Sequence, residues 1–369
     1  MVKKPFFSIV IPTYNRATDL QFALFCIFRQ SFSDFEVIIS DNCSTDETKN
    51  VIDKISDKRI HYSRTKETVG NALNIRRGVE QAKGEYVFLH SDDDFLAYEN
   101  SLEDIYNEII IHKSGYIRLN YLSLSTDRKR IFSYKVNKPF TGNKHVSPFL
   151  TNKEILSFIV DADPYFITGI IFKNTLPTDV KIVDSDPAPW IEILFYVIKN
   201  FGGYFMVKPH IIASWSRRKI KKNAEHHFFT LINGKLRCEN YFNAVKKKIG
   251  IEEYKTFLHN ELMLLYVIGF PVIKFKVGNK RMLHICERMN ILDTTIKINI
   301  TYWLYLAIAL IFPRIFLKLI GEIYLYFYSV FYKVHNHKEM VGILKKLEKE
   351  YLVSKKGVKA LKKPIFNFD

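Results

Sequence analysis

Three consecutive aspartates, Asp92, Asp93 and Asp94, are the strongest chemical signal in the sequence. Adjacent carboxylates repel one another, so they stay ionised only where solvent or a cation stabilises their charge. A hard divalent cation such as Mg²⁺ or Mn²⁺ takes oxygen ligands and commonly shares its coordination sphere with substrate phosphates. The triplet therefore predicts a site for a metal and a phosphate-bearing ligand. A solvated loop or a helix N-terminus, where acids are also frequent, is the alternative interpretation.

Two further polar clusters could contact the same ligand. Pro12, Thr13 and Tyr14 follow one apolar run, and Asp41 and Asn42 follow the next. A carboxylate or an amide at such a position can hydrogen-bond a nucleotide base or a ribose, although turn residues of these types are common. Neither the G-x-G-x-x-G nor the G-x-x-x-x-G-K-S/T signature occurs at a strand–helix turn, so the standard phosphate-binding loops are not available here.

Alternating strands and helices would position these clusters. We expect four strands and three intervening helices, with the strands at 8–12, 35–40, 59–63 and 85–90 and the helices at 19–29, 45–56 and 71–83. This alternation predicts an α/β fold with a parallel, doubly wound sheet. Ligands bind outside the carboxyl ends of such strands, and all three polar clusters fall there. The coincidence favours a ligand site over a solvated loop.

The chain beyond this repeat has a different character. After about residue 115 we expect strands at 167–172 and 204–207 and a helix at 189–199, and from residue 225 onward helices dominate. We therefore expect a first domain over residues 1–225 and a helical C-terminal region over residues 226–369.

Three stretches of the chain form an ordered motif set. Phe6–Asn15 reads FFSIVIPTYN, Ser40–Asp46 reads SDNCSTD and Gly84–Asp93 reads GEYVFLHSDD. In sequence and spacing this set resembles the inverting family-2 nucleotide-sugar glycosyltransferases, closely over about residues 5–100 and loosely to about residue 220. The resemblance implies a GT-A fold, which is a Rossmann-like, mostly parallel sheet with helices on both faces. It also implies sugar transfer of the bacterial surface-polysaccharide type.

The resemblance assigns nucleotide contacts to the first two clusters. Pro12, Thr13 and Tyr14 would line the nucleotide pocket, and Asp41 and Asn42 match the paired position that contacts the base. The family usually has a second aspartate where this chain has Asn42. That difference leaves the identity of the base open.

The resemblance also assigns the remaining donor contacts. Gly70 and Asn74 match a Gly-x-x-x-Asn stretch that faces the nucleotide. Asp92 would contact the ribose and the diphosphate, and Asp93 and Asp94 would hold the divalent metal, Mg²⁺ or Mn²⁺.

The catalytic base is where the chain departs from the family. A Glu-Asp pair usually lies about eleven residues before a glycine, and residues 190–191 hold Trp-Ile there instead. Glu192 and Asp186 are equally good candidates, and Asp184 is another nearby carboxylate. A base must reach the acceptor hydroxyl, and spacing alone does not choose among these acids or exclude that they are surface or capping residues.

A basic cluster at residues 216–222 contains Arg217 and Arg218. Arginine offers bidentate contacts to phosphate, and in the family this region folds back over the donor or the acceptor. A solvated charged face is the alternative interpretation.

The positive net charge of the chain indicates an anionic partner. Its 369 residues include 55 Lys and Arg against 38 Asp and Glu, a formal net charge of +17. Nucleic acid, an anionic membrane or a phosphorylated substrate would each fit this excess. Basic residues concentrate at 216–222 and 335–363, beside an apolar segment, rather than interleaving with aromatics on one face. This distribution favours a membrane surface and disfavours nucleic acid.

Residues 301–334 are the expected membrane-associating segment. Tyr302–Phe312 carries no charge, but it is shorter than the ~20 residues that a membrane span needs. Beyond it Arg314, Lys318 and Glu322 recur every four residues, which places them in one stripe of an amphipathic helix. We expect a helix lying in the headgroup region, with a basic tail after it. A true span and a helical core packed on the catalytic domain are the alternatives.

Together these features predict a glycosyltransferase that moves a sugar from a nucleoside diphosphate donor to a hydroxyl of a saccharide. A metal-dependent nucleotidyltransferase and a basic nucleic-acid-binding protein are the alternatives. The acceptor is expected to be lipid-linked, as in O-antigen or capsule assembly. The enzyme is expected to be peripheral on the cytoplasmic face of the bacterial inner membrane. Its four cysteines are expected to be reduced, because no CxxC pair or metal-type His spacing occurs.

Overall fold

The computed structural model describes residues 4–124, 131–133, 142–184, 188–214, 231–232, 235–313 and 337–354, together with the single residues 316, 319 and 323. The contacts divide the chain into two compact units. The first unit comprises residues 1–184, 190–219 and 332–369, and the second comprises residues 185–189 and 220–331.

The first unit begins with four parallel strands that carry the predicted polar clusters. The strands are β1 (Phe7–Thr13), β2 (Phe35–Asp41), β3 (Ile60–Arg64) and β4 (Tyr86–Leu89), joined by α1 (Ala17–Phe28), α2 (Thr48–Asp53) and α3 (Asn71–Glu80). β1 and β2 are buried β-branched and aromatic runs, as expected for a parallel sheet covered on both faces. Thr13 pairs with Asp41, and Asp41 pairs with Arg64, so the polar strand ends lie level at one edge.

The second half of the sheet mixes strand directions. The strand order is β3-β2-β1-β4-β9-β6-β10-β5. β9 (Ile170–Lys173) runs antiparallel between β4 and β6 (Tyr116–Leu124), β10 (Gly203–Ala213) is parallel to β6, and β5 (Phe95–Leu96) is antiparallel to β10. Two short strands, β7 (Ile131–Ser133) and β8 (Lys144–Val146), pair antiparallel with β6 and β10. The α/β class and the mostly parallel sheet are confirmed, since β1 to β4 are parallel as predicted and β6 and β10 form a further parallel pair.

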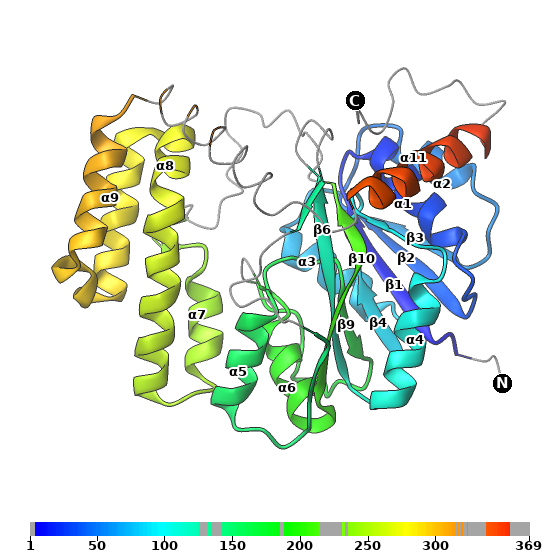
Figure 1. Cartoon of the computed structure of the whole chain (residues 1–369), viewed down its shortest axis with the longest axis horizontal. Helices are drawn as coiled ribbons and strands as arrows, with labels where there is room; N and C mark the ends of the chain where they lie inside the picture. Colours follow the sequence, from blue (N-terminus) through cyan, green and yellow to red (C-terminus); the bar gives the residue numbers. More distant parts are fainter. Residues whose placement is uncertain are drawn as a thin grey trace. The chain divides into compact units, whose positions relative to one another are not determined.

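Helices cover both faces of this sheet (Figure 1). On one face, α1 and α4 (Ser101–His112) contribute Leu20, Leu24, Leu102 and Ile105 to the same apolar core as Ile9 of β1. On the other face lie α3, α5 (Asn152–Asp161) and α6 (Ile191–Phe201). The close approach of α3 requires a glycine, because a Cβ on Gly78 would lie 2.5 Å from Val10 Cγ1.

The last described helix, α11 (His337–Ser354), belongs to the first unit. It buries Met340, Leu344, Leu347 and Tyr351 in one apolar cluster with Phe22 of α1, Phe95 of β5 and their neighbours. Figure 1 shows α11 beside α1. The expected division placed this helix in a C-terminal region over 226–369. The structure differs because the helix has an apolar stripe that completes the core of the first unit.

The second unit is helical in most of its described part. It contains the hairpin β11 (Leu231–Ile232) and β12 (Lys235–Leu236), then α7 (Glu239–Lys246), α8 (Ile251–Leu292), the 3-10 helix η1 (Thr294–Ile298) and α9 (Ile300–Ile311). Gly278, with φ of 79°, interrupts the helical backbone within α8. This glycine lets the chain adopt a left-handed conformation that other residues resist.

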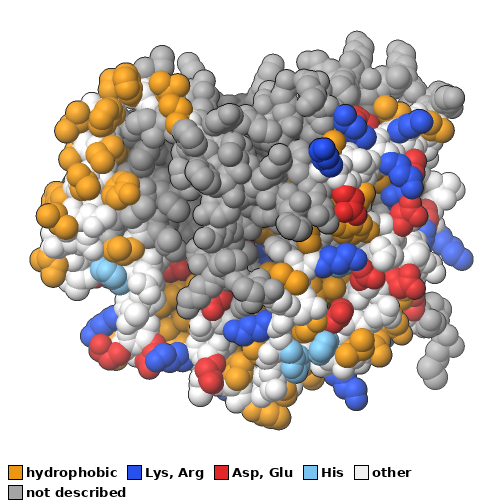
Figure 2. All heavy atoms as spheres, viewed as in Figure 1, with side chains coloured by type: hydrophobic (Ala, Val, Ile, Leu, Met, Phe, Trp, Pro, Cys, Tyr) orange, Lys and Arg blue, Asp and Glu red, His pale blue; other side chains and the backbone are white. Residues whose placement is uncertain are grey.

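One face of α9 is apolar and exposed. Tyr302, Leu306 and Ala309 are buried, whereas Ile300, Leu304 and Ile311 are 83%, 58% and 75% exposed. Figure 2 shows hydrophobic side chains gathered at the left of the view, over α9. In the described ranges, no helix combines the length and hydrophobicity that crossing a membrane requires. Arg314, Lys318 and Glu322 of the predicted stripe lie outside the described residues.

Candidate functional site

A single guanidinium joins two residues of the acidic triplet at the carboxyl end of β4. Arg16 Nη1 lies 2.7 Å from Asp92 Oδ1 and 2.6 Å from Asp93 Oδ2. Thr13 at the end of β1 donates its hydroxyl to Asp92 Oδ2 over 2.7 Å, and the Ser91 hydroxyl donates to Asp93 over 2.6 Å. Two carboxylates from the β4 loop thus converge on one cation contributed by the β1 loop.

Asp94 faces a different set of partners. One of its oxygens accepts a hydrogen bond from the Thr168 hydroxyl, and the other accepts one from the Ser214 backbone N–H over 3.0 Å. Burial raises the pKa of Asp94 well above its usual value, with repulsion from Asp93 as the second cause. Asp94 therefore ties the acidic loop to two other segments. Its predicted role as a metal ligand stays a prediction, and metal binding would compete with these hydrogen bonds.

Burial also shifts the pKa values of Asp92 and His90. The pKa of Asp92 is raised to about 6, chiefly by desolvation, which the attraction of Arg16 only partly offsets. Burial lowers the pKa of His90 to about 4, so this side chain is neutral near pH 7. His90 Nδ1 lies 2.7 Å from the Ser91 carbonyl, which fixes the ring at the start of the acidic loop.

A buried arginine supports the loop that holds Asp94. Arg118 of β6 is 1% exposed, and its guanidinium donates to the carbonyls of Ala162 and Thr168 over 3.0 and 2.7 Å. The Thr168 hydroxyl in turn accepts a hydrogen bond from the Ser91 N–H over 2.9 Å. Gly169, with φ of 89°, lets the chain turn here into β9. Arg118 thereby positions Thr168 and, through it, Asp94.

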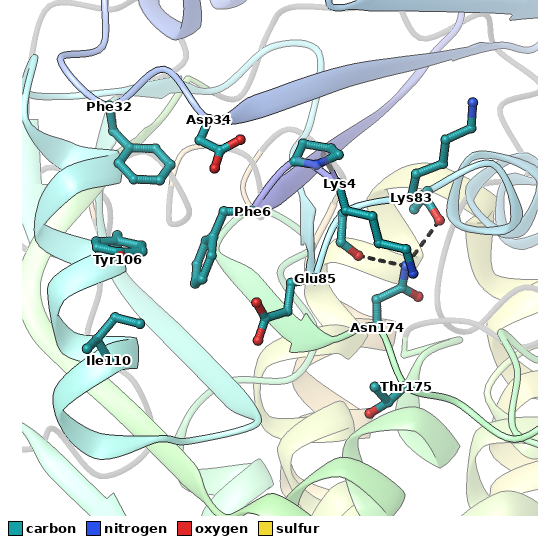
Figure 3. Close-up of a pocket in the computed structure, with 13 residues that line it drawn as sticks. Lys4, Phe6, Phe32, Asp34, Lys83, Glu85, Tyr106, Ile110, Asn174 and Thr175 are labelled. Atoms are coloured by element: carbon teal, nitrogen blue, oxygen red, sulfur yellow. Dashed lines mark hydrogen bonds between the residues drawn. The ribbon is translucent and has the colours of Figure 1, made fainter. Parts of the chain in front are cut away.

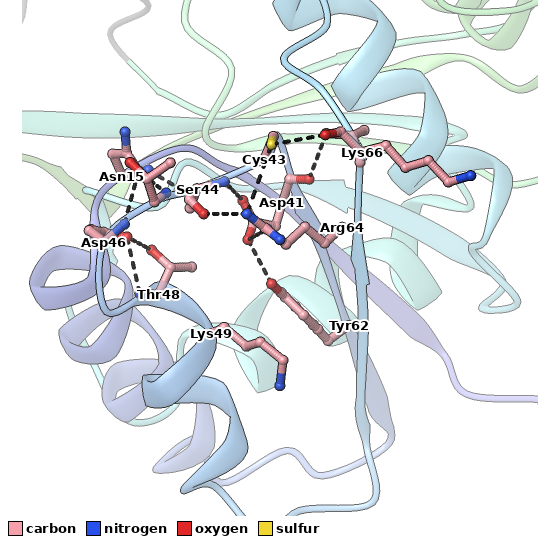
Figure 4. A network of polar contacts seen from close by, with 12 residues as sticks. Asn15, Asp41, Cys43, Ser44, Asp46, Thr48, Lys49, Tyr62, Arg64 and Lys66 are labelled. Atoms are coloured by element: carbon pink, nitrogen blue, oxygen red, sulfur yellow. Dashed lines mark hydrogen bonds and ion pairs between the residues drawn. The ribbon is translucent and has the colours of Figure 1, made fainter.

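Asp41 organises the end of β2 (Figure 4). Its carboxylate is fully buried and accepts hydrogen bonds from the Ser44 N–H over 2.9 Å and from the Tyr62 hydroxyl over 2.6 Å. Arg64 adds an ion pair at 3.7 Å. The structure places Asp41 where the sequence predicts it, at the carboxyl ends of the strands, but engaged with its own loop and with two side chains of β3.

The other nucleotide-side predictions also lie at this edge. Asn42 pairs its amide with the main chain of Val69, through N–H to oxygen contacts of 2.8 and 2.7 Å. Asn74 is buried and bonds Ser40 through both ends of its amide, at 2.9 and 2.8 Å. Gly70 directly precedes α3, and a Cβ added to it would have no heavy atom within 4 Å.

Two residues of this edge carry no prediction from the sequence. Asn15, with φ of 53°, accepts from the N–H groups of Thr45 and Asp46 at 2.6 and 3.3 Å and so joins the β1 and β2 loops (Figure 4). Arg16 is the second, and its place directly after the motif Pro12–Asn15 is the available signal. Thr168, in contrast, has no local sequence signal, because only the fold brings it to Asp94.

The candidate bases are described only in part. Glu192 lies in the first turn of α6 and is partly buried. Asp184 is exposed and is the last residue of the described range 142–184. Asp186, Arg217 and Arg218 lie outside the described residues. Pro12 and Tyr14 flank Thr13 at the end of β1, both partly exposed.

The acidic pair fits a divalent cation that also takes oxygens from a ligand. Among the described residues, no group of three or more His, Cys, Asp or Glu side chains could hold a metal alone. Asp92 and Asp93 nevertheless already direct one oxygen each at a single positive charge. Mg²⁺ is commonly held by one or two carboxylates together with substrate phosphates. The donor set therefore suits a cation whose remaining ligands arrive with the substrate.

A separate pocket of about 740 Å³ lies at the opposite edge of the sheet (Figure 3). Its lining includes residues just before β1, β2 and β4, so it opens at their amino ends, away from the acidic loop. Phe6, Phe32 and Tyr106 line one side, and Lys83 and Asn174 the other. The pocket therefore does not adjoin the site built around Arg16.

The first part of the chain is similar in sequence to known glycosyltransferases. Residues 8–151 match the family model for "Glycosyl transferase family 2". The GalNAc(5)-diNAcBac-PP-undecaprenol beta-1,3-glucosyltransferase of Campylobacter jejuni is 39% identical over 97 residues, which cover 25% of this chain and 31% of that protein. The poly(ribitol-phosphate) beta-N-acetylglucosaminyltransferase TarS of Staphylococcus aureus is 32% identical over 97 residues, covering 25% of this chain and 17% of that protein.

The structural likeness extends further along the chain. A crystal structure of S. aureus TarS residues 1–349 in complex with UDP-GlcNAc gives a TM-score of 0.57 at 16% identity, over 76% of this chain and 79% of that one. At this identity the likeness establishes the α/β, GT-A-like fold. The stretch matched in sequence spans only 31% of the length of the Campylobacter relative.

Proposed function

Because residues 8–151 match the family model for glycosyltransferase family 2, we propose that the chain is an inverting glycosyltransferase. It moves a sugar from a nucleoside diphosphate donor to a hydroxyl of a saccharide acceptor. The observation that carries the proposal is the convergence of Asp92 and Asp93 on one cation at the strand edge where the family motifs meet. Nucleotide ligands bind outside the carboxyl ends of strands in such sheets.

The residues of this edge have distinct roles in the proposal. Pro12, Thr13 and Tyr14 line the nucleotide pocket, Asp41 and Asn42 contact the base, and Gly70 and Asn74 face the nucleotide. Asp92 faces the ribose and the diphosphate. The support is their common position at the carboxyl ends of β1, β2 and β4.

A divalent cation, Mg²⁺ or Mn²⁺, would be held by Asp93 with Asp92 or Asp94 and would supply charge neutralisation of the diphosphate leaving group. The chain supplies the orientation. Thr13 and Ser91 fix the two carboxylates by hydrogen bonds of 2.7 and 2.6 Å, so their oxygens need not reorganise when the donor enters.

Glu192 and Asp186 remain the candidates for the base that removes the proton from the acceptor hydroxyl. Attack of that hydroxyl on the anomeric carbon, from the face opposite the diphosphate, gives inversion in one displacement. Glu192 has the additional support of a defined place in the first turn of α6, within the same unit as the acidic loop. Arg217 and Arg218 are proposed to contact the donor or acceptor phosphates.

The similar proteins suggest the biological setting. One is named for transfer to an undecaprenol-linked saccharide, and the other for modification of poly(ribitol-phosphate). We therefore place this chain in bacterial surface-polysaccharide biosynthesis, with a lipid-linked saccharide as acceptor and no nucleic acid partner. The solved TarS complex with UDP-GlcNAc makes UDP-sugars the first donors to test.

The exposed face of α9 supports peripheral attachment to the cytoplasmic leaflet of the inner membrane. Ile300, Trp303, Leu304 and Ile311 project from a helix without any charged residue. Apolar and aromatic side chains of this kind insert into the boundary between headgroups and acyl chains, and the net charge of +17 suits anionic lipid.

The activity is tested by transfer from UDP-, dTDP-, CDP- and GDP-sugars to a lipid-linked acceptor in the presence of Mn²⁺. We expect transfer from one of these donors, and we expect Asp93→Asn to abolish it. Removing the base should lower the rate about 10²- to 10⁴-fold, so Glu192→Gln and Asp186→Asn are compared in the same assay. Wild-type rates in EDTA would refute the metal role, and full activity in both carboxylate variants would refute both bases.

Attachment is tested by flotation with vesicles that contain anionic lipid. Replacing Ile300, Leu304 and Ile311 together by serine should release the protein from the vesicles. Leu73→Ser is the matched control, because Leu73 is 45% exposed on α3 of the first unit. Equal flotation of the wild type and both variants would contradict the role of α9.

A further inference from the structure

The cation between Asp92 and Asp93 is a side chain of the enzyme itself. Arg16 Nη1 contacts both carboxylates, and the side chains of Arg16, Asp92 and Asp93 are only 18%, 5% and 11% exposed. Salt bridges sheltered from water in this way are screened far less than surface pairs. The position that suits a divalent cation is therefore already occupied by one positive charge in the donor-free enzyme.

From this contact we infer that Arg16 is an internal substitute for the divalent cation, displaced only when metal and nucleoside diphosphate bind together. The inference rests on the proposed function and adds to it that the metal binds together with the nucleotide rather than before it. Metal alone should bind poorly, because it must compete with a guanidinium that is already seated between the two carboxylates. Nucleotide should strengthen metal binding by giving the guanidinium a new anionic partner.

Because both are positively charged, the Arg16 guanidinium and a divalent ion cannot occupy the site between Asp92 and Asp93 at the same time. A guanidinium and a divalent ion repel each other strongly at the distance of a shared carboxylate ligand. Arginine does not escape by losing its proton, because its guanidinium stays charged in proteins. Burial opposes the charge of Arg16, yet Asp92 and Asp93, with a smaller contribution from Asp19, outweigh it and raise the pKa of Arg16 above its usual value. The side chain must therefore move away from the pair for a metal to enter.

The ligand count explains why the nucleotide is needed. Asp92 and Asp93 each direct one oxygen at this position, and Asp94 would have to exchange a hydrogen bond from Thr168 or Ser214 to add a third. A diphosphate supplies further oxygen ligands to the metal and also offers a bidentate partner to the released guanidinium. The nucleotide therefore supplies the metal ligands that the two carboxylates leave open, and the metal releases the guanidinium that then binds the nucleotide.

The attachment of Arg16 allows such a movement. Its backbone precedes α1, and its side chain does not cap that helix. Its Nε is buried without a hydrogen-bond partner in the described part of the chain. The guanidinium is thus held at this site by its contacts with Asp92 and Asp93, with Asp19 as a further nearby negative charge.

The test measures Mn²⁺ binding to the full chain by calorimetry, without and with UDP, or with whichever nucleoside diphosphate stabilises the protein most. In the wild type we expect UDP to tighten Mn²⁺ binding at least tenfold. In Arg16→Gln we expect Mn²⁺ alone to bind at least tenfold more tightly than in the wild type, with a smaller further gain from UDP. Arg16→Lys keeps the charge and should behave like the wild type.

A matched control removes the same charge elsewhere. Arg59 pairs with Asp57 at 2.8 Å in the first unit, so Arg59→Gln should leave Mn²⁺ binding unchanged. Mn²⁺ affinity that is equal in the wild type with and without UDP would overturn the inference, even if Arg16→Gln failed to fold. In that case metal-dependent sugar transfer would still stand. Absence of Mn²⁺ binding under every condition, with full transfer in EDTA, would instead refute the metal in the proposed function and the inference with it.

Discussion

Replacing Leu344 by alanine should loosen the first unit, although this residue lies far along the chain from the sheet. Leu344 is fully buried among Met340, Leu347 and Tyr351 and the side chains of α1 and β5. Truncating a buried leucine removes its transfer free energy and leaves a cavity, which typically costs about 2–5 kcal/mol. Leu352 on the same helix is 39% exposed, so Leu352→Ala should cost less than about 1 kcal/mol.

The assay is urea unfolding followed by circular dichroism, combined with hydrogen exchange of peptides from α1. The exchange measurement is needed because the chain has two units and its unfolding need not be two-state. We expect Leu344→Ala to lower the unfolding midpoint and to speed exchange in α1, while Leu352→Ala does neither. Equal effects of the two substitutions, with unchanged exchange in α1, would refute the packing role of α11.

Three further predictions concern the first unit. Thr168→Val removes the hydroxyl that donates to Asp94, and leaving that buried carboxylate without this donor should cost about 1–3 kcal/mol in urea unfolding and should slow sugar transfer. Asn42→Asp introduces the aspartate that the family usually has at this position, but it loses the N–H that donates to the Val69 carbonyl. We therefore expect a lower melting temperature in a thermal-shift assay. The pKa of His90 is lowered to about 4 from 6.5, so as pH falls from 6.5 to 4 the unfolded state takes up a proton that the native state does not. His90 alone should therefore cost about 3 kcal/mol of stability over that window, while the raised pKa values of Asp92 and Asp94 act in the opposite direction. Urea unfolding of the wild type and His90→Asn at several pH values isolates the His90 contribution, and the variant should lack that loss.

Much of the fold follows from local patterns. The buried β-branched runs that form β1 and β2 stand out in the sequence, and so does the apolar stripe of α1. Their alternation places Asp41 and Asp92 at one sheet edge without any knowledge of tertiary contacts. The direction of β9 could not be predicted in this way, because strand pairing depends on the path of the chain rather than on the residues of the strand.

The site, too, could be predicted from the sequence only in part. Asp92 and Asp93 are visible as a motif, but the contact of Asp92 with Arg16 joins loops 76 residues apart in sequence. Thr168 meets Asp94 from 74 residues away, through a loop that Arg118 supports from inside the core. Such pairs are created by packing, so composition and spacing do not reveal them.

The same reasoning applies to the C-terminal helices. The charge of residues 335–363 suggests a basic tail, yet the apolar positions of α11 match a surface of the first unit that the local pattern cannot identify. A truncation before residue 295 would remove α9 and α11 together, so loss of membrane binding and loss of stability could not be separated. Substitutions on α9 avoid that difficulty.

The return of α11 to the first unit has a consequence for biosynthesis. The chain leaves this unit after residue 219 and re-enters it at residue 332, so the ribosome must make the entire second unit before α11 can emerge. At about 5–20 residues per second, the apolar surface of α1 and β5 stays uncovered for roughly 12–50 seconds on the nascent chain, because about 250 residues separate β5 from the buried face of α11. Such surface attracts chaperones and other nascent chains. Substitutions that weaken α11 should therefore reduce the yield of folded protein in cells more than their equilibrium cost alone would suggest.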